Sequence, residues 1–180
     1  MCDIFLLLQH YNNKQRQKVQ TNPVFEPLFM GRQQIHLSEV DSTNAYLSEH
    51  VAKTSPAEGT AVWADAQTQG RGQLGSSWLS AAGENLTISY LLRPKHLLAT
   101  EQFCLSQAAA LAVYSTLQYA GIDSAAARIK WANDLYVGDE KIAGILIENQ
   151  LQGYYLQHSI VGIGINVHQT DFPDFARAAT

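Results

Sequence analysis

The sequence predicts an α+β (mixed α/β) fold, a mixed β-sheet backed by helices on one side. Strand-like segments outnumber helical ones and surround a single long helix. The later strands follow one another through tight turns at residues 138–140 and 152–153, which indicates antiparallel pairing. With 180 residues, of which 46% are hydrophobic and 16% charged, the chain has the composition of a folded domain with its own core.

The first half of the chain predicts three strands, one helix and a glycine-rich loop. Asp41-Ser42-Thr43-Asn44 supplies residues that cap helices, a helical pattern follows over 45–51, and Pro56 stops it. Pro94 closes the last of the three strands. The strands are expected at residues 35–37, 60–64 and 85–92.

The second half predicts a long helix followed by hairpins. Thr100 is expected to cap this helix and Gly121 to end it. Because residues 103–117 are apolar almost all round, the helix is expected to be central and buried. Four strands follow, at 128–131, 135–137, 141–148 and 154–167.

Composition also limits the domain organisation and the partners. Residues 1–22 are expected to form a flexible tail and residues 23–180 one domain. The net charge of −4 argues against a chain that coats nucleic acid. No apolar run approaches the roughly 18 residues of a membrane helix. Two distant cysteines and six histidines without metal-binding spacing favour a reducing, cytoplasmic location.

The loop Gly70-Arg71-Gly72-Gln73-Leu74-Gly75 matches G-x-G-x-x-G, which alone is a weak signal. A dinucleotide-binding fold needs a helix that begins inside the motif, and a P-loop needs a lysine after it; both are missing here. Two interpretations remain open. The loop amides and Arg71 can hold a phosphate or carboxylate, or the loop is a plain surface hairpin.

Four further clusters carry polar groups, and each has a structural alternative. Lys130-Trp131-Ala132-Asn133-Asp134 can be an ordinary turn, and Lys141 can protect a sheet edge. Ser42-Thr43-Asn44 can be a simple helix cap. The glycines in Gly162-Ile163-Gly164-Ile165-Asn166 indicate a bulge or a close approach of another group to the backbone.

Taken together and in this order, the clusters resemble the catalytic domain of biotin protein ligases over about residues 35–168. The resemblance rests on D-S-T-N, Q-x-x-G-R-G-x-x-G-x-x-W, K-W-x-N-D-L, K-x-x-G-I-L-x-E and G-I-G-I-N. It implies a sheet like that of class II aminoacyl-tRNA synthetases. It also implies a two-step reaction with ATP, biotin and Mg²⁺: biotin is first activated as biotinyl-5′-AMP, and is then transferred to a lysine of a biotin carboxyl carrier protein.

The resemblance implies roles for individual residues, but assigns no metal ligands. Lys141 and Arg71 match the catalytic cations. Biotin would contact Ser42, Thr43, Asn44, Gln67, Gly70, Arg71, Gly72, Gln73, Lys141 and Gly144. ATP and the adenylate would contact Trp78, Lys130, Asn133, Asp134 and Asn166.

Some features depart from the family pattern. Many relatives have arginine where Gln73 stands and a basic residue near Ser76, so faster leakage of the adenylate is expected. No helix-turn-helix segment precedes the core, so no DNA binding is expected. The chain stops soon after the last motif, and a C-terminally truncated catalytic domain is expected.

Partners and rival functions complete these expectations. The carrier protein would belong to acetyl-CoA carboxylase or a related carboxylase, no membrane is involved, and a homodimer could form through the strand at 154–167. A lipoate–protein ligase or lipoyl transferase of the same fold, and an inactive biotin-binding module, remain alternatives.

Overall fold

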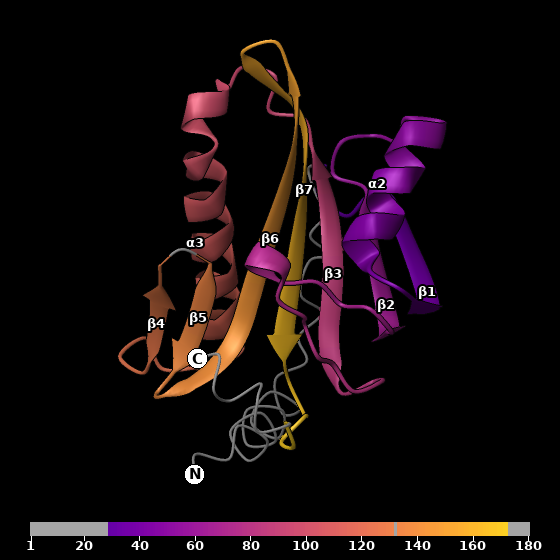
Figure 1. Cartoon of the computed structure of the whole chain (residues 1–180). Helices are drawn as coiled ribbons and strands as arrows, with labels where there is room; N and C mark the ends of the chain where they lie inside the picture. Colours follow the sequence, from indigo (N-terminus) through magenta and orange to yellow (C-terminus); the bar gives the residue numbers. More distant parts are fainter. Residues whose placement is uncertain (1–28, 132, 173–180) are drawn as a thin grey trace, which may run out of the picture.

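The computed structural model describes residues 29–131 and 133–172 (Figure 1). These residues form a seven-stranded sheet with the order β1-β2-β3-β7-β6-β5-β4, together with two α-helices. The predicted mixed fold is confirmed, whereas the tail predicted for residues 1–22 lies outside the described residues. The elements are β1 (Gln34–Val40), α2 (Thr43–Thr54), β2 (Ala61–Gln67), β3 (Asn85–Leu92), α3 (Phe103–Tyr119), β4 (Ala127–Lys130), β5 (Asp134–Val137), β6 (Glu140–Gln152) and β7 (Tyr155–Asn166).

The sheet is mixed because β1 and β2 run parallel, joined by the crossover helix α2, whereas the other neighbouring strands are antiparallel. Among the described residues, β1 and β4 are the edge strands. Strand β7 lies between β3 and β6 and is hydrogen-bonded to both. A homodimer through the strand at 154–167 was therefore a wrong prediction, because the backbone groups of β7 are already used inside the sheet.

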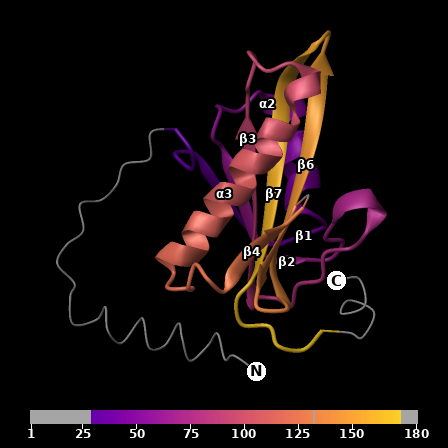
Figure 2. The same ribbon diagram turned by 90° about the vertical axis from the view of Figure 1, so that its left-hand side faces the viewer.

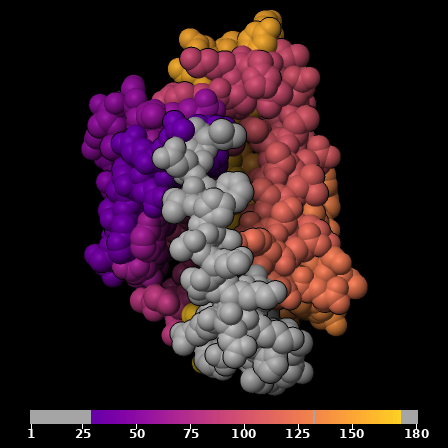
Figure 3. All heavy atoms as spheres, turned by 180° about the vertical axis from the view of Figure 1, so that it is seen from behind, coloured from indigo at the N-terminus to yellow at the C-terminus, as the bar shows by residue number. Residues whose placement is uncertain are grey.

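The two helices pack on opposite faces of the sheet. Ile160 of β7 belongs to the core cluster with Leu47 of α2, whereas the next residue, Val161, packs with Val113 of α3. Successive strand residues point to opposite faces, so the prediction that the helices back one side was wrong. Figure 2 shows the sheet between α3 and the loop around residues 73–75, and Figure 3 shows α3 along the back.

Helix α3 departs from its prediction at its start and in its burial. Thr100 lies in a separate 3₁₀ turn, Ala99–Glu101, and does not cap the helix. Only one side of α3 packs on β4, β5 and β6, whereas Leu111 and Tyr119 are 58% and 76% exposed. The prediction of all-round burial was wrong because no described residue covers the outer side. The buried residues of α3 are Ala110, Val113 and Leu117.

Helix α2 covers only part of the opposite face, where it packs against β2, β3 and β7. The glycine loop lies on another part of that face, in front of β6 (Figure 1). Within the described part of the chain, neither helix has the length and apolar character needed to cross a bilayer. The fold thus positions a polar site on the α2 face of the sheet, beside the N-terminal end of α2.

Candidate functional site

The glycine loop is a tight hairpin that needs its glycines. The backbone N–H of Trp78 donates to the Gly70 carbonyl at 2.9 Å, and the backbone N–H of Gly72 donates to the Ser76 carbonyl at 2.7 Å. A Cβ at Gly70 would lie 2.3 Å from the Trp78 carbonyl oxygen, and one at Gly72 would lie 2.3 Å from Ser76 Oγ. A short 3₁₀ turn, Gln73–Gly75, forms the tip. The hairpin interpretation is therefore correct in geometry, but the loop contacts the sheet.

Trp78 anchors the loop on two glycines of the sheet, Gly144 and Gly164, which we call the glycine shelf. The two are cross-strand partners on β6 and β7. A Cβ at Gly164 would lie 2.3 Å from Trp78 Cε2, and one at Gly144 would lie 2.8 Å from Cζ3. The glycines in these strands thus make room for an indole ring, which is the close approach predicted from their position.

A β-bulge places Lys141 on the same face as the glycine shelf. Lys141 and Gly144 are three residues apart, and a regular strand would direct them to opposite faces. The pairing of β5 with β6 shifts register at Leu135/Tyr136, which leaves Ile142 as an extra residue in β6. Ile142 packs into the α3 core instead, and Lys141 turns toward the site.

The cation of Lys141 lies close to the carboxylate of Asp134, and the amide of Asn166 contacts the Lys141 backbone. Lys141 Nζ lies 2.9 Å from Asp134 Oδ1 and 5.8 Å from the centre of the Trp78 ring. The Lys141 and Asp134 side chains are only 27% and 18% exposed, so solvent screens this pair little. Asn166 Nδ2 donates to the Lys141 carbonyl at 3.1 Å, and its buried Oδ1 has no hydrogen-bond partner among the described residues.

The start of α2 is a buried polar network. Ser42, Thr43 and Asn44 are all buried, yet the side chain of Ser42 makes no capping hydrogen bond. Instead Gln67 Oε1 accepts from the Thr43 N–H at 2.8 Å and lies 3.1 Å from Thr43 Oγ1. Ser89 Oγ donates to Asn44 Oδ1 at 2.6 Å and lies 2.8 Å from Thr43 Oγ1. The simple-cap interpretation of Ser42 is therefore wrong, because β2 supplies the acceptor.

Glu148 connects this network to the glycine loop, and sequence reasoning gave it no role. Its Oε2 accepts from Asn44 Nδ2 at 2.9 Å and from Arg71 Nη2 at 2.8 Å. A Cβ at Gly162 would lie 2.1 Å from Asn44 Oδ1, so only a glycine at this position leaves room for the Asn44 amide. The signal that could have found Glu148 is its even spacing from Gly144, which puts both on one face of β6.

Contacts therefore join most of the predicted residues into one site. A continuous network of contacts connects ten of them: Thr43, Asn44, Gln67, Gly70, Arg71, Trp78, Asp134, Lys141, Gly144 and Asn166.

Five predicted residues lie at the margins of this contact network. Ser42 and Gly72 adjoin it in sequence, and Gln73 lies in the 3₁₀ turn. Lys130 is one strand further out, on β4. Asn133 Nδ2 donates to the Ile145 carbonyl at 3.0 Å, which fixes the start of β5.

His158 is a titratable group with a shifted pKa that lies outside the site. Burial, followed by the positive charge of Arg93, lowers the pKa of His158, so its imidazole is neutral at pH 7. His158 is the cross-strand partner of Gln150, beyond Glu148 along β6.

The fold and the site define a mixed α+β domain with a partly buried polar site on one face of its sheet. Residues 37–166 match the Biotin/lipoate A/B protein ligase family, and the chain belongs to that family. Over 134 residues it is 40% identical to biotin–[acetyl-CoA-carboxylase] ligase of Paracoccus denitrificans, covering 73% of this chain and 53% of the relative. Over 148 residues it is 39% identical to the bifunctional ligase/repressor BirA of Bacillus subtilis, covering 81% and 44%.

A solved structure agrees with these matches. The biotin protein ligase from Aquifex aeolicus in complex with biotin and ATP superimposes with a TM-score of 0.64 at 37% identity. The match covers 81% of this chain and 57% of that one. The chain spans about half the length of the curated relatives it matches.

Proposed function

We propose that this chain catalyses the ATP-dependent attachment of biotin to a specific lysine of a biotin carboxyl carrier protein, in the cytoplasm and through biotinyl-5′-AMP. The observation that carries the proposal is the meeting of Lys141, Arg71 and the glycine loop on one face of the sheet, beside a buried polar network. The relatives named above support biotin rather than lipoate as the substrate.

The polar network at the start of α2 suits the ureido head of biotin. A ureido group has two N–H donors and one carbonyl acceptor, and buried polar groups need partners. Thr43 presents a hydroxyl group from a buried position, and Gln67 presents an amide group from a half-buried one. Both hydrogens of the Asn44 amide are already engaged, by Leu146 and Glu148, so we assign Asn44 to positioning this network.

The first reaction joins two anions, the carboxylate of biotin and the α-phosphate of ATP. A carboxylate oxygen attacks the α-phosphorus, and the bond from that phosphorus to the bridging oxygen breaks, releasing pyrophosphate. Lys141 and Arg71 offset the repulsion between the anions. Arg71 contacts Glu148 through a single terminal nitrogen, and a guanidinium has further donors for a ligand.

The nucleotide would lie toward β5, where Trp78, Lys130, Asn133, Asp134 and Asn166 are found. Mg²⁺ is held by one or two protein oxygens together with phosphates and water. Asp134 and the unpartnered Oδ1 of Asn166 fit that requirement, although the described residues contain no cluster of three metal-ligating side chains. When bound, Mg²⁺ would neutralise the phosphate charge, and Lys141 would remain the cation at the reacting carboxylate.

The second reaction needs no nucleophile from this chain. The carrier lysine attacks the carbonyl carbon of biotinyl-5′-AMP, the amide forms, and AMP departs with the electron pair of the broken bond. The adenylate is a mixed anhydride that water hydrolyses, so the loop over the glycine shelf serves to exclude water. Gly70 and Gly72 allow that loop to approach a ligand closely.

An ATP–pyrophosphate exchange assay tests the proposed function. We expect exchange that depends on biotin and does not occur with lipoate. Exchange with lipoate alone would identify a lipoate ligase of the same family. Biotin binding in calorimetry without any exchange would identify a binding module and refute the proposed catalysis.

Replacing Gln73 by arginine is expected to slow the dissociation of biotinyl-5′-AMP. The added cation at the tip of the loop would attract the phosphate of the adenylate, and one charge-assisted contact corresponds to roughly a tenfold slower release. The dissociation rate can be measured by chasing labelled adenylate from the protein with excess biotin and ATP. Equal rates for wild type and Gln73→Arg would show that this position does not govern retention.

A further inference from the structure

The hydrogen bonds at the start of α2 have a fixed direction, which begins at Glu148. Asn44 Nδ2 donates to Glu148 Oε2 at 2.9 Å and to the Leu146 carbonyl at 3.3 Å. Carboxylate and carbonyl oxygens only accept hydrogen bonds, so the Asn44 amide has to turn its NH₂ group toward them. The carbonyl oxygen of that amide, Oδ1, therefore faces the other way, toward Ser89 of β3.

Ser89 transmits this direction to Thr43, because a hydroxyl group has a single hydrogen. Ser89 is fully buried, and its Oγ lies 2.6 Å from Asn44 Oδ1 and 2.8 Å from Thr43 Oγ1. Since Asn44 Oδ1 is an acceptor only, the hydrogen of Ser89 is used there. The contact between the two hydroxyl groups then needs the hydrogen of Thr43, which is directed into the protein at Ser89 Oγ.

Thr43 Oγ1 consequently has only lone pairs left for a ligand. The second acceptor within its reach is Gln67 Oε1 at 3.1 Å, which already accepts from the Thr43 backbone N–H at 2.8 Å. Whichever of the two acceptors it chooses, the hydroxyl hydrogen stays inside the network. Thr43 is only 4% exposed, so a ligand group that contacts this oxygen does so away from water, where an unmatched polar group is costly.

We propose that Ser89 is a positioning residue that determines specificity: it keeps the Thr43 hydroxyl an acceptor, so the site selects a head group that carries an N–H donor. This inference rests on the proposed function, in which that head group is the ureido ring of biotin. Ser89 acts through Thr43 and not by contact with the ligand. A ring with oxygen in place of the N–H would set one lone pair against another and be rejected.

The chain contains a matched serine that stands outside the network. Ser159 of β7 is also fully buried, but it faces the α3 side of the sheet, because its neighbour Ile160 packs with α2. Its Oγ has no hydrogen-bond partner among the residues that the structure describes. Ser159→Ala therefore removes the same atom from the same depth as Ser89→Ala, and leaves the network intact.

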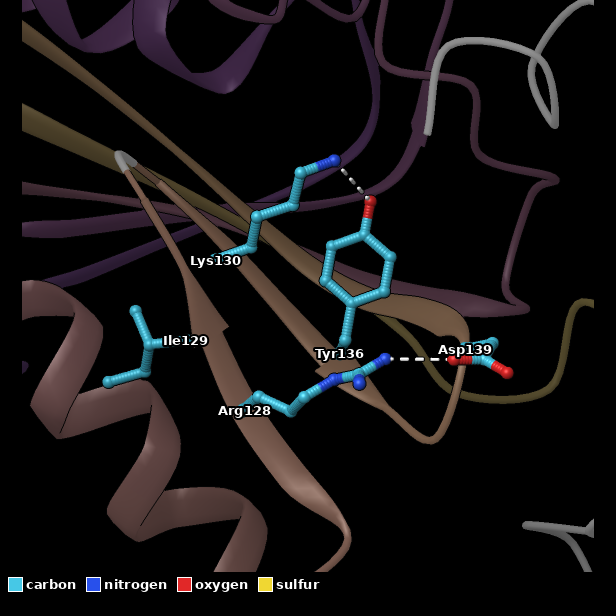
Figure 4. A pocket seen from close by; sticks show the side chains of 5 residues that line it. All are labelled: Arg128, Ile129, Lys130, Tyr136 and Asp139. Atoms are coloured by element: carbon cyan, nitrogen blue, oxygen red, sulfur yellow. Dashed lines mark hydrogen bonds and ion pairs between the residues drawn. The ribbon is translucent and has the colours of Figure 1, made fainter.

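Figure 4 shows a second control, on the face that carries Lys141. The Tyr136 hydroxyl lies 3.5 Å from Lys130 Nζ, on the hairpin of β4 and β5. Tyr136 is the cross-strand partner of Lys141, and directly opposed residues share a face. Because β5 lies beyond β6 in the sheet order, Tyr136→Phe removes a hydroxyl group from this face at a position remote from β3 and Ser89.

The test measures by calorimetry the binding of biotin and of its two cyclic carbamate analogues, in which one or the other ureido N–H is replaced by oxygen. The wild type is expected to prefer biotin over one of them by about tenfold or more, the scale of a lost hydrogen bond. In Ser89→Ala the Thr43 hydroxyl can turn its hydrogen outward, so the preference should fall to about threefold or less and biotin affinity by about tenfold. Ser159→Ala and Tyr136→Phe are expected to keep both quantities.

An unchanged preference in Ser89→Ala, or equal losses of biotin affinity in Ser89→Ala and Ser159→Ala, would overturn the inference. Thr43→Val should abolish the preference by itself and make Ser89→Ala without further effect; a full effect of Ser89→Ala in that background would also overturn it. Circular dichroism confirms that each variant is folded.

The proposed function can fail separately, because calorimetry needs no turnover. Biotin-dependent exchange in the wild type together with an unaffected Ser89→Ala variant would refute only the role of Ser89. Biotin binding with the expected preferences but without exchange would refute only the proposed catalysis. Absence of biotin binding by the wild type would overturn both.

Discussion

Replacing Lys141 by alanine is expected to lower biotin-dependent adenylate formation by about 10²-fold or more, the effect of removing a preorganised charge at a reacting centre. The Nζ of Lys141 lies beside Asp134 and over the Trp78 ring, on the face where the carboxylate and the α-phosphate would meet. Without it the two anions would repel each other with only Arg71 to offset them. Single-turnover formation of labelled adenylate measures the effect directly.

The control must separate charge from stability, because Lys141→Ala leaves the partly buried Asp134 without its ion-pair partner. Lys141→Ala combined with Asp134→Asn removes the stranded carboxylate, and its thermal unfolding should return toward that of the wild type. Because Asp134 is itself placed on the nucleotide side, Asp134→Asn is measured alone as well, and we expect the folded double variant to form adenylate more slowly than Asp134→Asn. If Lys141→Ala alone changes the rate by less than about threefold, Lys141 has no part in the chemistry.

The later strands and their antiparallel pairing could be predicted because they depend on local signals. Period-two apolar patterns and the turns at Gly138 and Gly153 are visible in the sequence, and both glycines have positive φ in the structure. The placement of the helices could not be predicted in this way. It depends on which face of β7 each helix covers, a choice made by long-range packing of Ile160 and Val161.

The candidate site shows the same division between local and long-range signals. The motifs identified Lys141, Arg71 and the glycines, but not how they meet. The bulge at Ile142, which turns Lys141 to the correct face, is a property of the pairing between two strands. Gln67 as the acceptor for the first N–H of α2, and Glu148 as the link to Arg71, both join residues far apart in the chain. Such contacts leave no periodic signal in a single sequence.

Replacing Gly164 by alanine is expected to displace the Trp78 indole and weaken biotin binding by about tenfold or more, since binding needs well-positioned groups. The new Cβ would lie 2.3 Å from Cε2, 2.5 Å from Cζ2 and 2.7 Å from Nε1 of that ring. Because the backbone N–H of Trp78 donates to the Gly70 carbonyl, movement of Trp78 would carry Arg71 away from the sheet. Overpacking of this kind also lowers the free energy of unfolding by about 1–3 kcal/mol.

A double-mutant cycle with Trp78→Ala shows whether the indole is the cause. Denaturant unfolding of the wild type, Gly164→Ala, Trp78→Ala and the double variant gives the coupling between the two positions. Once the ring is absent, the added methyl group has room, so we expect Gly164→Ala to change stability little in the Trp78→Ala background. If the two changes are additive, Gly164 does not act through Trp78, and the glycine shelf does not anchor the loop. Biotin affinity measured on the same four proteins then reports whether that anchoring positions Arg71 for the ligand.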